Sequence, residues 1–397
     1  MHRGHIGEVN CLRVFGVVAV VLIHAYGFYL AMPVSGPVVR ISQELIVNLL
    51  RFARYVFMFV TGVVLFYTYN GRKFNVGSFF HRRLKNLVIP YVVWTGIYLL
   101  IQHWSKMISW PNTAAFVVLW AQNILDGEGF YTLYYILVVI EFYLLFPLIL
   151  GVFKPRRPRL AAVALITAGI LFYALYHYVL EMHPTAVTAL AGGSGVVTWF
   201  LAYKDRLIIS YLPIYLLGGL AGLYVEAWRK WLSEHLVLVA AALLLGAGLV
   251  TGEYFYLYRH LGQSWYLTVS VFKPNIYLYS LGVIAMSFLL ARVLERQKTI
   301  RPLIALLAAN SLGIYLMHPA VEYLIHSYLW PHVLGLPGTL LVILDPALAI
   351  AVSCLISQLL GGNRYTRFIV GEAGNLPRKA WFGKGKSSGA RPHLLAQ

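Results

Sequence analysis

Ten runs of about 15 to 25 mostly apolar residues recur along this chain of 397 residues. A helix needs about 20 such residues to cross the hydrocarbon core of a bilayer. Backbone polar groups in lipid must be satisfied within the segment, so the runs are predicted to be helices. The run at 236–250 is short for a span. The ten predicted spans are residues 9–30, 45–69, 87–102, 130–153, 160–180, 207–226, 236–250, 272–290, 303–327 and 340–360.

The composition excludes a soluble fold of this length. Hydrophobic residues make up 60% of the chain and charged residues 12%, about half the charged fraction of an ordinary soluble domain. We therefore expect an all-α polytopic membrane domain over residues 1–360, followed by a flexible basic tail over 361–397. The apolar segment 113–125 is too short to span, and we expect it to be re-entrant or interfacial.

The net charge of +18 reflects membrane topology rather than nucleic-acid binding. The basic residues sit in short bursts between apolar runs, with little aromatic interleaving. With ten spans, 24 of the 32 Lys and Arg residues fall on the side that holds both termini. Cytoplasmic segments carry such an excess. We expect a multi-pass protein of the cell membrane with both termini in the cytoplasm, and no nucleic-acid partner.

Arg13 and His24 are ionisable residues on one face of the first predicted span. They are eleven residues apart, which is about three helical turns and about 16 Å. An ionisable group near the membrane centre costs at least about 2.5–3.5 kcal/mol, so it is a functional candidate. The pair suits an elongated ligand with its anionic head at Arg13 and its reactive end at His24. The alternative is that Arg13 snorkels and His24 bonds a neighbouring helix.

Other polar residues in the spans carry similar alternatives. Glu141 lies in the middle of the fourth span and needs a partner there. His318 and Glu322 are i and i+4 on one helix face, either facing a ligand or hydrogen-bonding each other. Arg51 and Arg54 begin the second span on the outer side, where snorkelling to lipid headgroups explains them.

A basic loop is predicted at residues 71–90, before the third span. Arg82, Arg83 and Lys85 sit next to the span, where they either set topology or hold phosphate groups. No metalloprotease, hydrolase-elbow or phosphate-loop motif occurs, and neither Cys11 nor Cys354 has metal-ligand spacing, so we expect no bound metal.

Several of these segments resemble the acyltransferase-3 family of integral membrane acyltransferases. Arg13 and His24 match the family's Arg-x10-His pattern in its first span. Further similar segments are residues 57–62, 82–91, 141–147 and 311–319. Asn10 stands where the family often has an acid, and Thr61 replaces the usual Ser. No SGNH esterase-like domain follows the tenth run, so the chain is similar to the stand-alone form.

The resemblance implies acyl transfer from a cytoplasmic acyl-CoA, usually acetyl-CoA, to a hydroxyl of an extracytoplasmic glycan or lipid-linked saccharide. Arg13, Arg82, Arg83 and Lys85 would then bind the CoA phosphates. His24 would act as general base or as acyl carrier, and His318 and Glu322 would face the acceptor. A polysaccharide exporter of the same family is the alternative function, which predicts a continuous aromatic-lined pore. The oligomeric state stays open.

Overall fold

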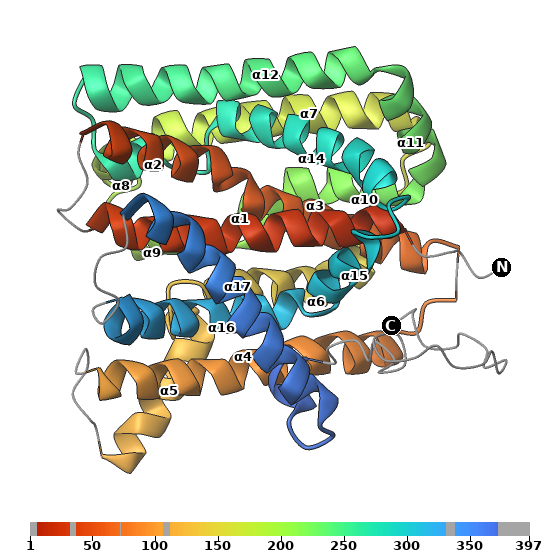
Figure 1. Cartoon of the computed structure of the whole chain (residues 1–397). Coiled ribbons are helices and arrows are strands. Elements are labelled where there is room, and N and C mark those ends of the chain that lie inside the picture. Colours follow the sequence, from red (N-terminus) through yellow and green to blue (C-terminus); the bar gives the residue numbers. More distant parts are fainter. Residues whose placement is uncertain (1–5, 32–36, 72, 106–111, 331–337, 372–397) are drawn as a thin grey trace, which may run out of the picture.

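The protein is a helical bundle, seen in a computed structural model that describes residues 6–31, 37–71, 73–105, 112–330 and 338–371 (Figure 1). Every regular element among these residues is a helix of the α, 3-10 or π type. This confirms the all-α fold. The described chain starts at one end of the bundle, which we name the N-terminal end (Figure 1). The opposite end is the one where α1 (Gly7–Ala31) finishes.

The described residues contain eight single helices that are long and apolar enough to cross a membrane, and up to ten spans if each of two bent pairs counts as one. The bent pairs are Gly195–Arg206 with Ile208–Leu223, at 46°, and Arg301–Ala309 with Ser311–Leu329, at 73°. Together they match the ten predicted spans in order. The single helices are Gly7–Leu30, Val38–Tyr69, Val76–Trp104, Tyr134–Val152, Pro158–Glu181, Leu236–His260, Pro274–Leu294 and Leu340–Gly362.

The third span begins much earlier than the hydropathy indicated. α4 covers Val76–Trp104, so most of the predicted loop at 71–90 is helix. The side chain of Asn75 accepts a hydrogen bond from the Ser78 amide at 2.8 Å and starts the helix. The prediction was wrong because basic residues interrupt the apolar pattern without interrupting helical hydrogen bonding.

The seventh span is not short. It is a 25-residue helix, Leu236–His260, made of α12 (Leu236–Glu253) and the π-helical turn η5 (Tyr254–His260). The prediction stopped at residue 250 because Glu253 ends the apolar run. In the structure the helix continues past Glu253, whose carboxylate forms an ion pair with Lys273.

Glycines allow α3 (Ala53–Tyr69) and α10 (Leu212–Leu223) to pack with their backbones in close contact. A Cβ atom added to Gly62 would lie 2.2 Å from the Tyr215 carbonyl oxygen. One added to Gly222 would lie 2.4 Å from the Val63 carbonyl oxygen. Small residues at helix contacts permit this approach in membrane bundles. The contact fixes α3, the helix that carries Arg54.

α5 (Thr113–Asp126) is the short apolar segment, and its 14 residues are too few to span. It packs on α4. Trp120 donates its Nε1 hydrogen to the Val92 carbonyl at 3.0 Å, and Tyr91 donates its hydroxyl to the Ile124 carbonyl at 2.7 Å.

Ordered packing continues beyond the expected domain edge at residue 360. α17 (Gly338–Gly362) is followed by η8 (Arg367–Ile369), which folds back on α4. Trp94 donates its Nε1 hydrogen to the Ile369 carbonyl at 2.9 Å, and Val370 is only 1% exposed. Residues 369–371 are therefore packed against the bundle, whereas most of residues 362–368 are exposed and the rest of the predicted tail lies outside the described residues.

Candidate functional site

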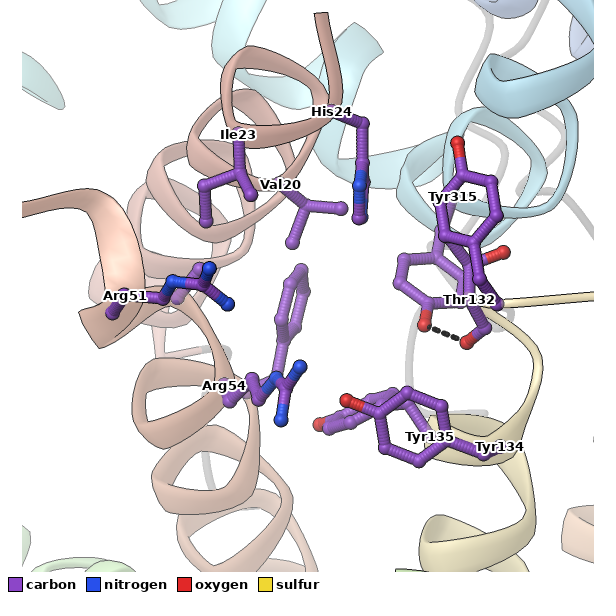
Figure 2. A pocket seen from close by; sticks show the side chains of 12 residues that line it. Val20, Ile23, His24, Arg51, Arg54, Thr132, Tyr134, Tyr135 and Tyr315 are labelled. Atoms are coloured by element: carbon purple, nitrogen blue, oxygen red, sulfur yellow. Dashed lines mark hydrogen bonds between the residues drawn. The ribbon is translucent and has the colours of Figure 1, made fainter. Parts of the chain in front are cut away.

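A pocket of about 50 Å³ lies among four helical segments, toward the opposite end of the bundle (Figure 2). One water molecule needs roughly 10–15 Å³ of such cavity volume, so a few water molecules or one small group fit. The segments are α1, the 3-10 turn η1 (Leu50–Phe52) with α3, the start of α6 (Tyr134–Val152), and α16 (Ser311–Leu324). The lining residues are Val20, Ile23, His24, Arg51, Ala53, Arg54, Phe57, Tyr131, Thr132, Tyr134, Tyr135 and Tyr315.

Two arginines give this pocket positive charge. The 3-10 turn has about three residues per turn, so Arg51 and Arg54 project to the same side. Figure 2 shows both guanidinium groups and the imidazole of His24 pointing into the space, with tyrosines on the opposite side. Arg54 lies 5.2 Å from the ring centre of Tyr134. No acidic residue is among the described residues that line the pocket. The arginines therefore line the pocket rather than reaching out to lipid headgroups.

His24 lies against two rings from other segments. Its ring centroid is 5.4 Å from that of His318, with an interplanar angle of 28°, and 4.9 Å from that of Tyr131. His318 is fully buried. The tertiary fold thus brings together two histidines from the first and ninth predicted spans.

His318 and Glu322 do not hydrogen-bond each other in the structure. The Nδ1 atom of His318 is assigned as donating to the Ile314 carbonyl at 3.1 Å, which leaves Nε2 as an acceptor. That Nε2 atom and both carboxylate oxygens of Glu322 are buried, with no hydrogen-bond partner among the described residues. Buried polar atoms without partners are rare in proteins, so these three need an explanation.

Aromatic contacts hold the pocket wall. The Tyr315 hydroxyl donates to the Thr132 carbonyl (Figure 2), and the Tyr135 and Tyr315 ring centroids are 5.7 Å apart. The rings of Phe130 and Tyr98 stack at 4.2 Å and anchor the turn that precedes α6. Residues 130–133 form this turn rather than the start of the span.

A second cationic cluster lies toward the N-terminal end of α1. Arg13 is an electrostatic neighbour of Arg83 on α4 and of Tyr143 on α6. Arg83 also interacts with Tyr69 at the end of α3. The side chain of Arg13 has no carboxylate within ion-pair distance among the described residues. The structure thus places Arg13 and Arg83 together, about 16 Å along α1 from His24.

The other two basic candidates on α4 do not join this cluster. Arg82 is exposed, and its Nε atom donates to the Ser78 carbonyl at 3.2 Å on the same helix. Lys85 is also exposed. Only Arg83 of the three is partly buried, because helical geometry sends neighbouring residues to different faces.

Glu141 does not line the pocket. Its Oε2 atom accepts a hydrogen bond from the Ile208 backbone amide at 2.7 Å. Ile208 begins η4 (Ile208–Tyr211), where the sixth predicted span bends. The carboxylate therefore satisfies a backbone donor at a helix break.

The acidic residue Glu8 on α1 forms an ion pair, but its partner is not Arg13. Glu8 binds Arg229 on α11 (Val225–Glu234) through two hydrogen bonds, at 2.8 and 2.7 Å. The pair ties the start of α1 to α11, and it leaves Arg13 unneutralised at the N-terminal end.

A family model described as an acyltransferase domain, Acyl_transf_3, matches residues 6–361. The chain belongs to the acyltransferase-3 family. No curated protein and no solved structure matches it. The match covers nearly the whole helical bundle, including both cationic clusters, and the chain is a membrane acyltransferase.

In this acyltransferase-3 protein, Arg51 and Arg54 line the pocket, although their sequence signal is weak. Their spacing of three residues at the head of an apolar run was visible, but it fits snorkelling equally well. The tyrosines of the pocket wall carried no distinguishing signal, since the chain contains 28 Tyr residues. Their role depends on which of them face α1.

Proposed function

We propose that this protein transfers an acyl group, most simply acetyl, from a cytoplasmic acyl-CoA to a hydroxyl of an extracytoplasmic cell-surface glycan or lipid-linked saccharide. The cell membrane is the proposed location. The observation that carries the proposal is the pocket, where His24 lies with Arg51 and Arg54 and without a lining carboxylate. The family membership supplies the reaction class.

The pocket chemistry suits acyl transfer. Attack of a hydroxyl on a thioester places negative charge on the carbonyl oxygen in the transition state, and preorganised donors stabilise that charge. Arg51 and Arg54 would supply those donors. His24 would either remove the hydroxyl proton as a general base or accept the acyl group itself before passing it on. Both roles use the same imidazole in the same place.

The cluster of Arg13 and Arg83 suits the donor's phosphate groups. Guanidinium groups bind phosphates through charge-assisted hydrogen bonds, and neither residue is neutralised by a described carboxylate. A donor held there would extend along α1, with its thioester at His24. Arg82 and Lys85, which are exposed, would add attraction from the surface rather than direct contacts.

The acceptor would approach His24 from the opposite end of the bundle. His318 and Glu322 lie on α16 with buried polar atoms that lack partners among the described residues. These atoms would face the hydroxyl group of the acceptor. Glu141 would act only through the helix break that it holds.

Export of a polysaccharide is supported less well. A glycan channel needs a continuous pore, whereas the pocket at His24 has about 50 Å³ and contains two cationic side chains. Aromatic residues do line it, but they are locked by contacts such as Tyr315 with Thr132.

The test is His24→Ala, with acylation of envelope glycans measured by mass spectrometry per unit of membrane-inserted protein. Loss of a positioned proton-transfer group lowers the rate by about 10²–10⁴-fold, and loss of an acyl carrier by more. His260→Ala, at an exposed position, serves as the control and retains activity. Normal specific activity in the His24 variant would end the proposal.

A further inference from the structure

A line of buried ionisable side chains leads away from His24 along α16 and across to α17. It comprises His318, Glu322, His326 and Asp345. We propose that these four groups form a proton path between the His24 pocket and the opposite end of the bundle. The path rests on the proposed acyl transfer, because it removes the proton that this reaction releases.

The spacing on α16 places the first three groups in one row. His318, Glu322 and His326 are at i, i+4 and i+8, so each lies about one turn beyond the last. One step is about 6 Å along the axis. His326 sits in the π-helical turn η6 (Ile325–Leu329) that continues α16. Such turns occur frequently at functional sites.

The side chains are buried up to the end of the row. His318 and Glu322 are fully buried, the His326 side chain is 5% exposed, and Asp345 is 0% exposed. The residues that follow His326, at 327–329, are exposed. The row thus begins beside His24 and ends where the helix meets the surface.

Every group in the row has a buried polar atom without a hydrogen-bond partner among the described residues. These atoms are His318 Nε2, Glu322 Oε1 and Oε2, His326 Nδ1 and Asp345 Oδ1. Such atoms bind bridging water, and chains of Asp, Glu and His inside membranes carry protons. Each gap in the row therefore has a proton acceptor or donor at both of its ends.

His326 and Asp345 form the last step. His326 Nε2 and Asp345 Oδ2 are 2.7 Å apart, and Asp345 is also a charged neighbour of Glu322. Phe28 stacks on His326 at 4.4 Å, and Tyr29 meets its edge at 5.3 Å, so α1 closes the other side. Tyr98 and Tyr131 are also electrostatic neighbours of Glu322.

The chain contains a second buried histidine–carboxylate pair, which serves as a comparison for His326 and Asp345. His177 Nδ1 and Glu181 Oε2 are 2.8 Å apart on the π-helical turn η2 (Tyr176–Glu181), and both side chains are buried. Neither residue has a buried polar atom left unpaired among the described residues. The His326–Asp345 pair differs because it keeps a free atom on each partner.

The proton balance gives the path its function. The acceptor's O–H bond breaks, its oxygen bonds to the acyl carbon, and the C–S bond of the donor breaks to release a thiolate. The thiolate takes a proton from water at the donor side. The hydroxyl proton goes to His24 and then, through His318, Glu322 and His326 with Asp345, to water at the opposite end. One proton is taken up and one is released in each turnover.

The test is His326→Ala in membranes that contain the full chain. Transfer of labelled acetyl from acetyl-CoA to the envelope glycan fraction is measured per unit of inserted protein. We expect a loss of about 10²-fold, at the lower end for positioned proton-transfer groups. Added imidazole should restore at least a tenth of the wild-type rate, because it fits the space left by the side chain and carries protons. His177→Ala is the matched control and keeps the wild-type rate.

His326→Gln serves if the alanine variant does not accumulate, since Gln can bond Asp345 but does not relay protons at neutral pH. We expect the same loss without rescue by imidazole, because the Gln side chain fills the space that imidazole would need, whereas a merely structural role of His326 would be kept by the Gln–Asp345 bond. If the wild type transfers acetyl but either variant is unimpaired, or the alanine variant is slow without rescue, the path is overturned and the proposed function stands. If the wild type transfers no acetyl, the proposed function falls and the path falls with it.

Discussion

Arg82 and Arg83 are neighbours with the same charge, but they lie in different environments. Arg83 is partly buried beside Arg13, Tyr69 and Tyr143, whereas Arg82 next to it is exposed. An exposed cation interacts through water and is screened by salt, while a partly buried one is screened much less. The two arginines should therefore contribute unequally to binding a phosphate.

Replacing Arg83 with Gln should raise the apparent KM for acyl-CoA by at least about tenfold, because a charge-assisted hydrogen bond to phosphate contributes about 1.5–3 kcal/mol. Arg82→Gln is the matched control and should change the donor KM less than about threefold. Initial rates at varied acyl-CoA and fixed acceptor give both values. Equal effects from the two variants would contradict the placement of the donor beside Arg13.

At the scale of elements, one helix contact positions the arginines of the pocket. α3 carries Arg54 and packs on α10 through glycines, so its position depends on the close approach of two backbones. Gly218 and Gly222 on α10 would place Cβ atoms 2.1 and 2.4 Å from carbonyl oxygens of α3. A backbone oxygen cannot move aside as a flexible side chain can. The contact therefore tolerates no added methyl group without a shift of the helices.

Gly222→Ala should lower the melting temperature of the detergent-solubilised protein, since overpacking costs about 1–3 kcal/mol. Gly248→Ala on α12 is the control, because a Cβ atom there meets nothing within 4 Å. That variant should leave the melting temperature unchanged or slightly higher, as alanine favours helix. The same melting temperature for both variants would show that α3 and α10 are not packed this closely.

At the scale of the whole molecule, a cationic cluster lies toward each end of α1 among the described residues. Arg13 and Arg83 lie toward the N-terminal end, and Arg51 and Arg54 lie with His24 toward the opposite end. This arrangement suits a reaction whose donor and acceptor come from different sides of the membrane. A cytoplasmic donor reaches the Arg13 and Arg83 cluster only if the N-terminal end of the bundle faces the cytoplasm.

The distribution of basic residues predicts that orientation. A fluorescent protein fused after Gln397 should be bright, and alkaline phosphatase inserted after Gly193, between α8 (Pro184–Leu190) and α9 (Gly195–Tyr203), should be active. Phosphatase is active only outside the cytoplasm, whereas the fluorescent protein folds inside it. An inactive phosphatase at Gly193 together with an active one after Gln397 would reverse the orientation.

The sequence by itself determined the all-α fold and the order of the spans, because the bilayer fixes the length and apolar character of any segment that crosses it. It also singled out Arg13, His24, His318 and Glu322, because ionisable groups are costly in a span. The apolar pattern did not predict the start of α4 or the full length of the seventh span. In both places charged residues interrupt the apolar pattern but not the helix.

Only the tertiary structure decided which of these residues meet. Periodicity places a residue on a face of its own helix, but it does not state how that helix is rotated toward its neighbours. The contact of His24 with His318 joins residues 294 positions apart, and the 73° bend before α16 helps to set it. The entry of Arg51 and Arg54 into the pocket follows from the glycine contact that holds α3. Packing among helices, rather than any local pattern, places His24 beside His318 and in the pocket.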